Sequence, residues 1–174
     1  KKGLEAAARE ARYAFFAGLP GKVATAHTAD DNAETVLMHL VRGTGLKGLG
    51  GIAPVNGKYI RPMLTVTRRQ VVAFLEEYHI CYVEDSSNQE DDFLRNRLRH
   101  HVMPLLKEEN PRFSQNTSQM ALRLREDEDA LAAAARYKDL PTVEELKSLP
   151  SAIRSRMLEQ FLKERVFGPM GMTR

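Results

Sequence analysis

The chain has 174 residues, of which 43% are hydrophobic and 28% are charged, a composition typical of globular proteins and unlike that of disordered or fibrous sequences. The only cysteine, Cys81, excludes an internal disulfide and a zinc ribbon. No apolar run reaches membrane-spanning length and the first residues lack the pattern of a secretory signal, so we expect a cytoplasmic protein with no membrane partner.

Up to about residue 93, helix and strand signals alternate. The expected elements are a helix at 4–16, a buried strand at 22–26, a helix from 28–30 to 42, a glycine-rich loop or series of turns at 43–52, a strand at 58–64, a helix at 68–79, a strand at 81–85 and a polar loop at 86–92. Capping patterns support two of these helices, with Gly43 at the end of one and Thr67 with Gln70 at the start of the other. This alternation predicts an α/β fold.

After residue 93 only helical patterns remain. They cover 94–106, 112–140 and 151–161, with a further capping pattern at Thr142 and Glu145. We therefore predict two domains, an α/β part at 1–93 that is a partial Rossmann-like domain and a small all-helical part at 94–174. Helical spacing predicts that Met120, Leu124 and Leu131 are core residues of helices that support the first part.

The stretch "AHTADDNAETVLMHL" at 26–40 places several acids at the start of a helix. One acid or hydroxyl is sufficient for a cap, which is the simpler interpretation. Asp31 and Glu34, however, are spaced i, i+3 and share a face about 140° from the centre of the apolar stripe. Two carboxylates beyond the end of a strand are placed to bind an ammonium group or a hydrated Mg²⁺, and His27 in the turn can contact a phosphate or act as an acid or base.

Basic residues gather in two places, at 61–69 and 95–101, as they do on nucleic-acid-binding surfaces. Arg95 and Arg99 are spaced i, i+4 on one helical face, a pair suited to phosphate or carboxylate, while Arg97 points elsewhere. The alternative is a simple salt bridge from Arg95 or Arg99 to Glu84 or Asp85.

Four histidines and the glycine-rich loop give weaker indications of a functional site. The histidines at 39, 79, 100 and 101 lack metal-ligand spacing, so we interpret them as structural or surface residues. The loop at 43–51 lacks the preceding strand and the Lys-Ser ending of a phosphate-binding P-loop.

Taken together, "EAAAREARY" (5–13), "ATAHTADDNAETVLMHLVRGTGLKGLGGI" (24–52), "IRPML" (60–64) and "VEDSSN" through "RNRLRHHVMPLL" (83–106) resemble the tRNA(Ile)-lysidine synthetase family of the PP-loop ATP pyrophosphatase superfamily. The resemblance implies a ligase that uses ATP, with Mg²⁺, to adenylate C2 of the wobble cytidine in a tRNA(Ile) with a CAU anticodon. The side-chain amine of L-lysine then displaces AMP to give lysidine.

The same resemblance implies roles for particular residues. The family's HxxDDxxET segment maps onto His27, Asp30, Asp31, Glu34 and Thr35, which predicts a reaction centre formed by His27 and the three acids. Within it, Asp31 and Glu34 would hold the ammonium of lysine, Asp30 or Asp31 would bind Mg²⁺, and the general base is one of the carboxylates or His27. Further binding residues are implied at Arg9, for the carboxylate of lysine or a phosphate, and at Arg95, Asn96 and Arg99, for the adenylate or the tRNA backbone.

The chain departs from the family pattern in two ways. It lacks the ATP-binding SGGxDS motif, so we expect an internal fragment that is inactive alone and whose exposed sheet favours association, including a homodimer. Thr28 also replaces a histidine that is frequent in the family. Two alternative functions are a tRNA 2-thiolation enzyme, which a lone Cys81 disfavours, and a non-catalytic RNA-binding module in which the acids serve only as caps.

Overall fold

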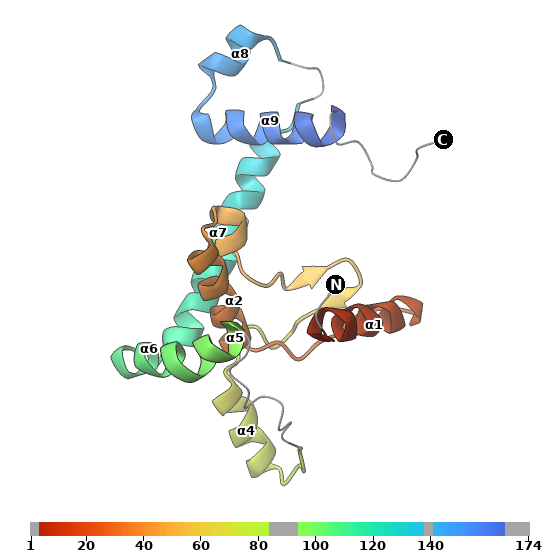
Figure 1. The fold of residues 1–174 in the computed structure, drawn as a ribbon, viewed down its shortest axis with the longest axis vertical. Coiled ribbons are helices and arrows are strands. Elements are labelled where there is room, and N and C mark those ends of the chain that lie inside the picture. The colour runs from red at the N-terminus through yellow and green to blue at the C-terminus, as the bar shows by residue number, and fades with distance from the viewer. Residues whose placement is uncertain (1–3, 84–93, 138–140, 166–174) are drawn as a thin grey trace. The chain divides into compact units, whose positions relative to one another are not determined.

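The computed structural model describes residues 4–83, 94–137 and 141–165, and the chain divides into two compact units between Leu122 and Arg123. The elements of the first unit (Figure 1) are α1 (Leu4–Gly18), β1 (Val23–Ala24), α2 (Ala29–Arg42), α3 (Leu46–Leu49), β2 (Val55–Asn56), β3 (Tyr59–Ile60), α4 (Arg68–Glu77), α5 (Leu94–Arg97), the π-helical turn η2 (Leu98–Val102), α6 (Met103–Glu109) and the first part of α7 (Phe113–Ala134). The second unit contains the rest of α7, α8 (Val143–Ser148) and α9 (Ser151–Arg165). No helix among the described residues is long and apolar enough to cross a membrane.

A small sheet with strand order β1-β3-β2 lies in the first unit. β1 runs parallel to β3, with Val23 opposite Tyr59, and β2 is antiparallel to β3. The β2–β3 hairpin turns at Gly57, whose φ of 58° is a conformation that favours glycine. Helix α1 packs on this sheet through Tyr13, whose ring centroid lies 5.0 Å from that of Tyr59.

A lysine ties α1 to the hairpin. The Lys58 ammonium donates hydrogen bonds to the carbonyls of Phe16 at 2.7 Å, Ala17 at 3.1 Å and Leu19 at 2.6 Å. These carbonyls lie at the C-terminal end of α1, where a helix has acceptors without intrahelical partners and a negative dipole end. The ammonium therefore completes the end of α1 and holds it beside β3.

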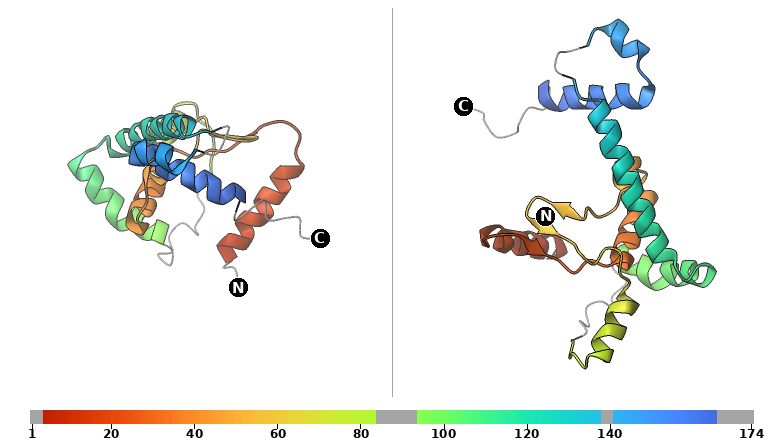
Figure 2. Two further views of the ribbon diagram at one scale, coloured as in Figure 1. Left: turned by 90° about the horizontal axis from the view of Figure 1, so that it is seen from above. Right: turned by 180° about the vertical axis from the view of Figure 1, so that it is seen from behind.

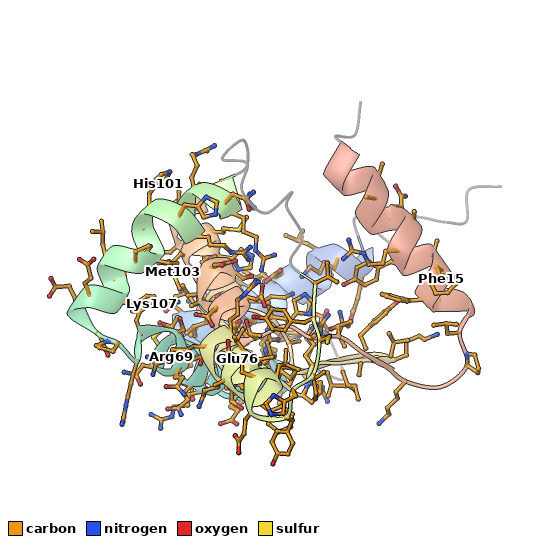
Figure 3. All side chains as sticks on the ribbon, turned by 90° about the horizontal axis from the view of Figure 1, so that it is seen from below. Phe15, Arg69, Glu76, His101, Met103 and Lys107 are labelled. Carbon is orange, nitrogen blue, oxygen red and sulfur yellow. The ribbon has the colours of Figure 1, made fainter. Side chains whose placement is uncertain are left out.

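Helix α2 is the centre of the first unit. Ala29, Ala33 and Val36 are buried along it, and α5 and η2 contact it (Figure 2). The π-helical turn matters for this packing, because a turn with i to i+5 hydrogen bonds sets the buried residues Leu98 and Met103 five positions apart on one face. Figure 3 shows Met103 and Lys107 on the side of this helical run that faces α2, and His101 pointing away from it.

Several expected elements form as predicted, because their signals are local. Thr28, Thr67 and Thr142 each accept a hydrogen bond from the third helical residue in a capping box, and Gly43 ends α2. The α/β class, with a sheet before residue 61 and helices after residue 93, is confirmed in the described residues. The compact units divide after Leu122 and not at residue 93. Helices α5 and η2 contact α2, and α6 and the start of α7 are hydrogen-bonded to α2 through Lys107 and Ser114.

Three expectations need correction. The glycine-rich stretch is not only loop, since Leu46–Leu49 forms one helical turn. The strand expected at 81–85 is absent over the described residues 81–83, where Val83 is 95% exposed and has no strand neighbour to pair with, and the rest of it and the loop at 86–92 lie outside the described residues. Met120 is not core, at 43% exposed, because α7 buries its small residues Ser114, Thr117, Ser118 and Ala121 instead. Leu124 and Leu131 are half-buried.

Candidate functional site: an acidic helix start paired with two arginines

The start of α2 combines a cap with a charged site. The Asp31 Oδ2 atom accepts hydrogen bonds from the backbone N–H and the hydroxyl of Thr28, each at 2.8 Å, while the backbone N–H of Asp31 donates to the Thr28 hydroxyl at 3.4 Å. The other oxygen, Oδ1, accepts a hydrogen bond from Arg95 Nη2 at 3.0 Å. One carboxylate therefore caps the helix and also binds a guanidinium.

Glu34 lies one turn further along the same face and is almost completely buried, with 2% of its surface exposed. Its oxygens accept hydrogen bonds from Arg95 Nε at 2.7 Å, Arg99 Nε at 2.6 Å and Arg99 Nη2 at 2.9 Å. These bonds to Glu34 raise the pKa of Arg99 against the opposing effect of burial, so Arg99 stays protonated. We name Asp31, Glu34, Arg95 and Arg99 the acid–arginine cluster.

The predicted shared face of Asp31 and Glu34 and the pairing of Arg95 with Arg99 are both present in this cluster. The arginines bridge to Asp31 and Glu34, and the alternative partners Glu84 and Asp85 lie outside the described residues. The face shared by Asp31 and Glu34 lies away from the apolar stripe of α2, and Glu34 is buried because the two guanidinium groups cover it.

Asp30 has a separate set of partners. Its Oδ1 accepts hydrogen bonds from Lys107 Nζ and Ser114 Oγ, both at 2.7 Å, and its Oδ2 accepts one from the backbone N–H of Arg68 at 2.7 Å. Burial would raise the pKa of Asp30, but the hydrogen bonds from Lys107, Arg68 and Ser114 outweigh it and hold the pKa below the ordinary value. Asp30 thus joins α2 to α4, α6 and α7.

His27 lies in the turn after β1. Its Nδ1 atom is 2.9 Å from the hydroxyl of Thr25, and the ring is half-buried. Arg61 follows β3 at the same edge of the sheet, since β1 and β3 are parallel. It is buried, donates from Nη1 to the Ala53 carbonyl at 2.7 Å and has no hydrogen-bond partner at Nε.

The remaining expected residues are placed less fully. Asn96 is half-buried in α5, and the Thr35 hydroxyl donates to the Asp31 carbonyl at 2.8 Å, within α2. The backbone of Arg9 lies in α1, and its side chain is outside the described part of the structure.

The expected magnesium ligands do not fit the ion in this arrangement. Both oxygens of Asp30 accept hydrogen bonds from Lys107, Ser114 and Arg68, and both oxygens of Asp31 accept them from Thr28 and Arg95. Among the described residues there is no group of three acidic, histidine or cysteine side chains that can hold a metal ion. Mg²⁺ requires several free oxygen ligands, which Asp30 and Asp31 do not offer in this arrangement.

Sequence reasoning missed the residues that contact α2 on the side away from the acid–arginine cluster. Asn32 is fully buried, and its amide donates to Ser118 Oγ at 2.9 Å and accepts from the backbone N–H of Ile52 at 2.7 Å. Ser118 in turn donates to the Leu64 carbonyl at 2.6 Å. A signal for these contacts was present in α7, where small residues recur at 114, 117, 118 and 121 with the spacing of one helical face.

The fold and the site define an α/β protein that carries charged groups beyond the ends of parallel strands, the usual place for ligands in such sheets. The chain belongs to the PP-loop domain family, whose model matches residues 1–106. Full-length relatives are similar over more of the chain. A tRNA(Ile)-lysidine synthase of Geobacillus kaustophilus is 39% identical over 186 residues, which cover 95% of this chain and 40% of that protein.

Two further relatives carry the same name. The protein of Parabacteroides distasonis is 47% identical over 62% of this chain and 26% of its own length, and that of Streptococcus pyogenes serotype M1 is 48% identical over 68% of this chain and 28% of its own length. The chain therefore spans between about a quarter and two fifths of the length of these relatives.

Proposed function

We propose that the complete protein is a tRNA(Ile)-lysidine synthase and that this chain supplies its amino-acid site. In the proposed reaction the C2 oxygen of the wobble cytidine attacks the α-phosphorus of ATP and releases pyrophosphate. The side-chain amine of L-lysine then attacks C2, AMP leaves with the oxygen, and the amine loses its proton. The similarity to three synthases of that name supports this reaction.

The observation that carries the proposal is the acid–arginine cluster. It brings two carboxylates and two guanidinium groups from segments more than sixty positions apart into hydrogen-bond distance. The substrates have the matching charges, since lysine brings an ammonium and ATP, the adenylate and tRNA bring phosphates. Asp31 and Glu34 are proposed to hold the ammonium, and Arg95 and Arg99 to neutralise phosphate charge.

Other expected residues keep narrower roles in this proposal. His27 or a carboxylate of the cluster accepts the proton of the attacking amine, and Asn96 and Arg9 contribute to substrate binding. Asp30 is proposed to position α2, because its oxygens are bonded to Lys107, Ser114 and Arg68. Magnesium is proposed only as the counter-ion of ATP, and the site of action as the cytoplasm, where tRNA is modified.

The test is transfer of radiolabelled lysine to a tRNA(Ile) transcript with a CAU anticodon by the complete protein in the presence of ATP. We expect labelled tRNA from the wild type and a loss of at least about tenfold in Asp31→Asn and in Glu34→Gln, because each removes one carboxylate charge opposite the ammonium. Asp127→Asn, an exposed acid in the second unit, is the matched control and keeps full transfer. Normal transfer in both cluster variants would favour the RNA-binding module instead.

A lysine-independent modification would contradict the proposal in another way. A 2-thiolation enzyme would add sulfur to the tRNA and would not use lysine. Such an enzyme needs paired cysteines or an iron–sulfur cluster, and this chain has only the exposed Cys81. Mass spectrometry of the tRNA separates the two reactions, because lysine and sulfur add different masses.

A further inference from the structure

The four members of the acid–arginine cluster neutralise one another. Two negative charges on Asp31 and Glu34 face two positive charges on Arg95 and Arg99, with nitrogen–oxygen distances between 2.6 and 3.6 Å. The groups proposed for the cationic substrate and those proposed for the anionic substrates are therefore already bound to each other in the structure.

Burial makes this pairing an obstacle for either substrate alone. The side chain of Glu34 is 3% exposed beneath Arg95 and Arg99, which are 31% and 28% exposed. An ammonium group reaches Glu34 only if a guanidinium moves away. That movement breaks the two charge-assisted hydrogen bonds that each guanidinium makes to Asp31 and Glu34, and with no phosphate present the arginine gains no new anionic ligand in exchange.

The converse holds for a phosphate. A phosphate that draws Arg95 and Arg99 away leaves the Glu34 carboxylate buried without a cation, which is costly in free energy. When both ligands are present, every charge has a partner again, with the ammonium on the carboxylates and the phosphate on the guanidinium groups.

We propose that the cluster works by exchange of ion-pair partners, so that an anionic ligand on Arg95 and Arg99 frees Asp31 and Glu34 for the ammonium of the amino acid. The inference rests on the proposed function, since it takes lysine and ATP as the two ligands. It makes their binding positively cooperative, and because coupling is reciprocal, lysine strengthens nucleotide binding by the same factor. The exchange keeps lysine binding weak until the nucleotide or the adenylate is bound.

Calorimetry of the complete protein tests the exchange. Lysine is titrated with and without a non-hydrolysable ATP analogue whose α,β-bridge is a methylene group, at one magnesium concentration. We expect the analogue to tighten lysine binding to the wild type by about 5- to 150-fold, the usual range of coupling between sites. Titration of the analogue with and without lysine should give the same factor.

The variants give the sharper result. Arg95→Met keeps much of the side-chain volume and removes the competing charge, so we expect lysine without analogue to bind more tightly than to the wild type and the analogue to add little. Arg99→Met should behave in the same way. The matched control is Arg97→Met, an exposed arginine of the same helix, which keeps the wild-type coupling.

The possible failures differ from one another. If the wild type binds lysine with equal affinity with and without the analogue, the exchange is overturned and the proposed function is unaffected. This result does not depend on any substitution that could disturb folding. Weaker lysine binding in both arginine variants, with unchanged thermal unfolding, also overturns it and indicates that the arginines position the acids. No lysine binding to the wild type under any condition, with tRNA included, contradicts the proposed function itself.

Discussion

Asp30 and Asp31 are adjacent in sequence and bind entirely different partners. Asp31 caps α2 and pairs with Arg95, whereas Asp30 turns to Lys107, Ser114 and the start of α4. Successive helical residues are separated by about 100°, which is enough to send two neighbouring side chains to different elements. The resemblance to a family motif predicts chemistry for both, and their different contacts support the proposals of a charged site at Asp31 and a positioning role for Asp30.

The lowered pKa of Asp30 gives a pH dependence. A carboxyl whose folded pKa lies below its unfolded value adds stability that is fully present above the unfolded pKa, about 4, and is lost as the pH falls through the folded pKa. We expect the free energy of unfolding to fall on acidification below about pH 4 in the wild type and to fall less in Asp30→Asn. Urea unfolding at several pH values measures this.

At neutral pH, Asp30→Asn should lower the free energy of unfolding by about 1–3 kcal/mol, because Lys107 loses its charged partner. Asp129→Asn, an exposed acid outside this contact, serves as the control. Parallel pH curves for the wild type and Asp30→Asn would contradict a stabilising charge on Asp30.

Gly51 and Gly57 have nearly the same backbone conformation but different surroundings, and this contrast gives a second prediction. Their φ angles are 56° and 58°, so alanine is strained at both, by about 1–2 kcal/mol. A Cβ at Gly51 would lie 2.3 Å from Asn32 Oδ1, whereas one at Gly57 meets open space. We expect Gly51→Ala to lower the free energy of unfolding by clearly more than Gly57→Ala, which equal losses in urea unfolding would contradict.

Among the elements, α2 is held on two sides by different chemistry. Its charged face meets Arg95 and Arg99, and its opposite face is fixed by the Asn32 amide to Ser118 of α7 and to Ile52. A buried polar network of this kind specifies one rotation of the helix, since any other leaves amide and hydroxyl groups unpaired. The rotation is what turns Asp31 and Glu34 toward the arginines.

A double-mutant cycle on Asn32→Ala and Ser118→Ala tests this link. We expect Asn32→Ala to lower the free energy of unfolding by about 2–4 kcal/mol, because it removes the acceptor of the Ile52 N–H and the donor to the Ser118 hydroxyl and leaves a cavity at a buried position. The two effects should couple by about 0.5–3 kcal/mol. Additive effects would show that the two residues do not act as one network, and Ser155→Ala, exposed on α9, is the control.

At the scale of the whole molecule, exposed apolar side chains support the expectation that the chain associates with itself. β1 and β2 are the outer strands of the described sheet, and Phe15, Val55 and Val83 are 66%, 61% and 95% exposed. Unpaired edges and apolar side chains in water favour pairing with another chain. We therefore predict that this chain alone forms dimers or larger species.

Light scattering after size-exclusion chromatography gives the mass. We expect it to rise with concentration, and Phe15→Ser together with Val55→Ser to lower it. Val143→Ser, equally exposed but in the second unit, should leave it unchanged. A monomer at all concentrations up to about 100 µM would contradict the prediction.

Local signals in the chain were sufficient for most helices and for the family. A capping box depends on residues three positions apart, so Thr28, Thr67 and Thr142 marked true helix starts without any knowledge of the fold. The HxxDDxxET segment, with Arg95, Asn96 and Arg99, indicated the PP-loop relatives and the residues of the candidate site.

Contacts between distant segments had to come from the folded chain. Burial of Glu34 depends on arginines 61 and 65 positions away, the role of Asp30 on Lys107 and Ser114, and the rotation of α2 on Ser118. The spacing of residues along a helix predicts which face a side chain lies on. It does not predict which distant segment packs against that face. Met120 shows the same limit, since α7 packs its small residues inward and leaves the larger one in water.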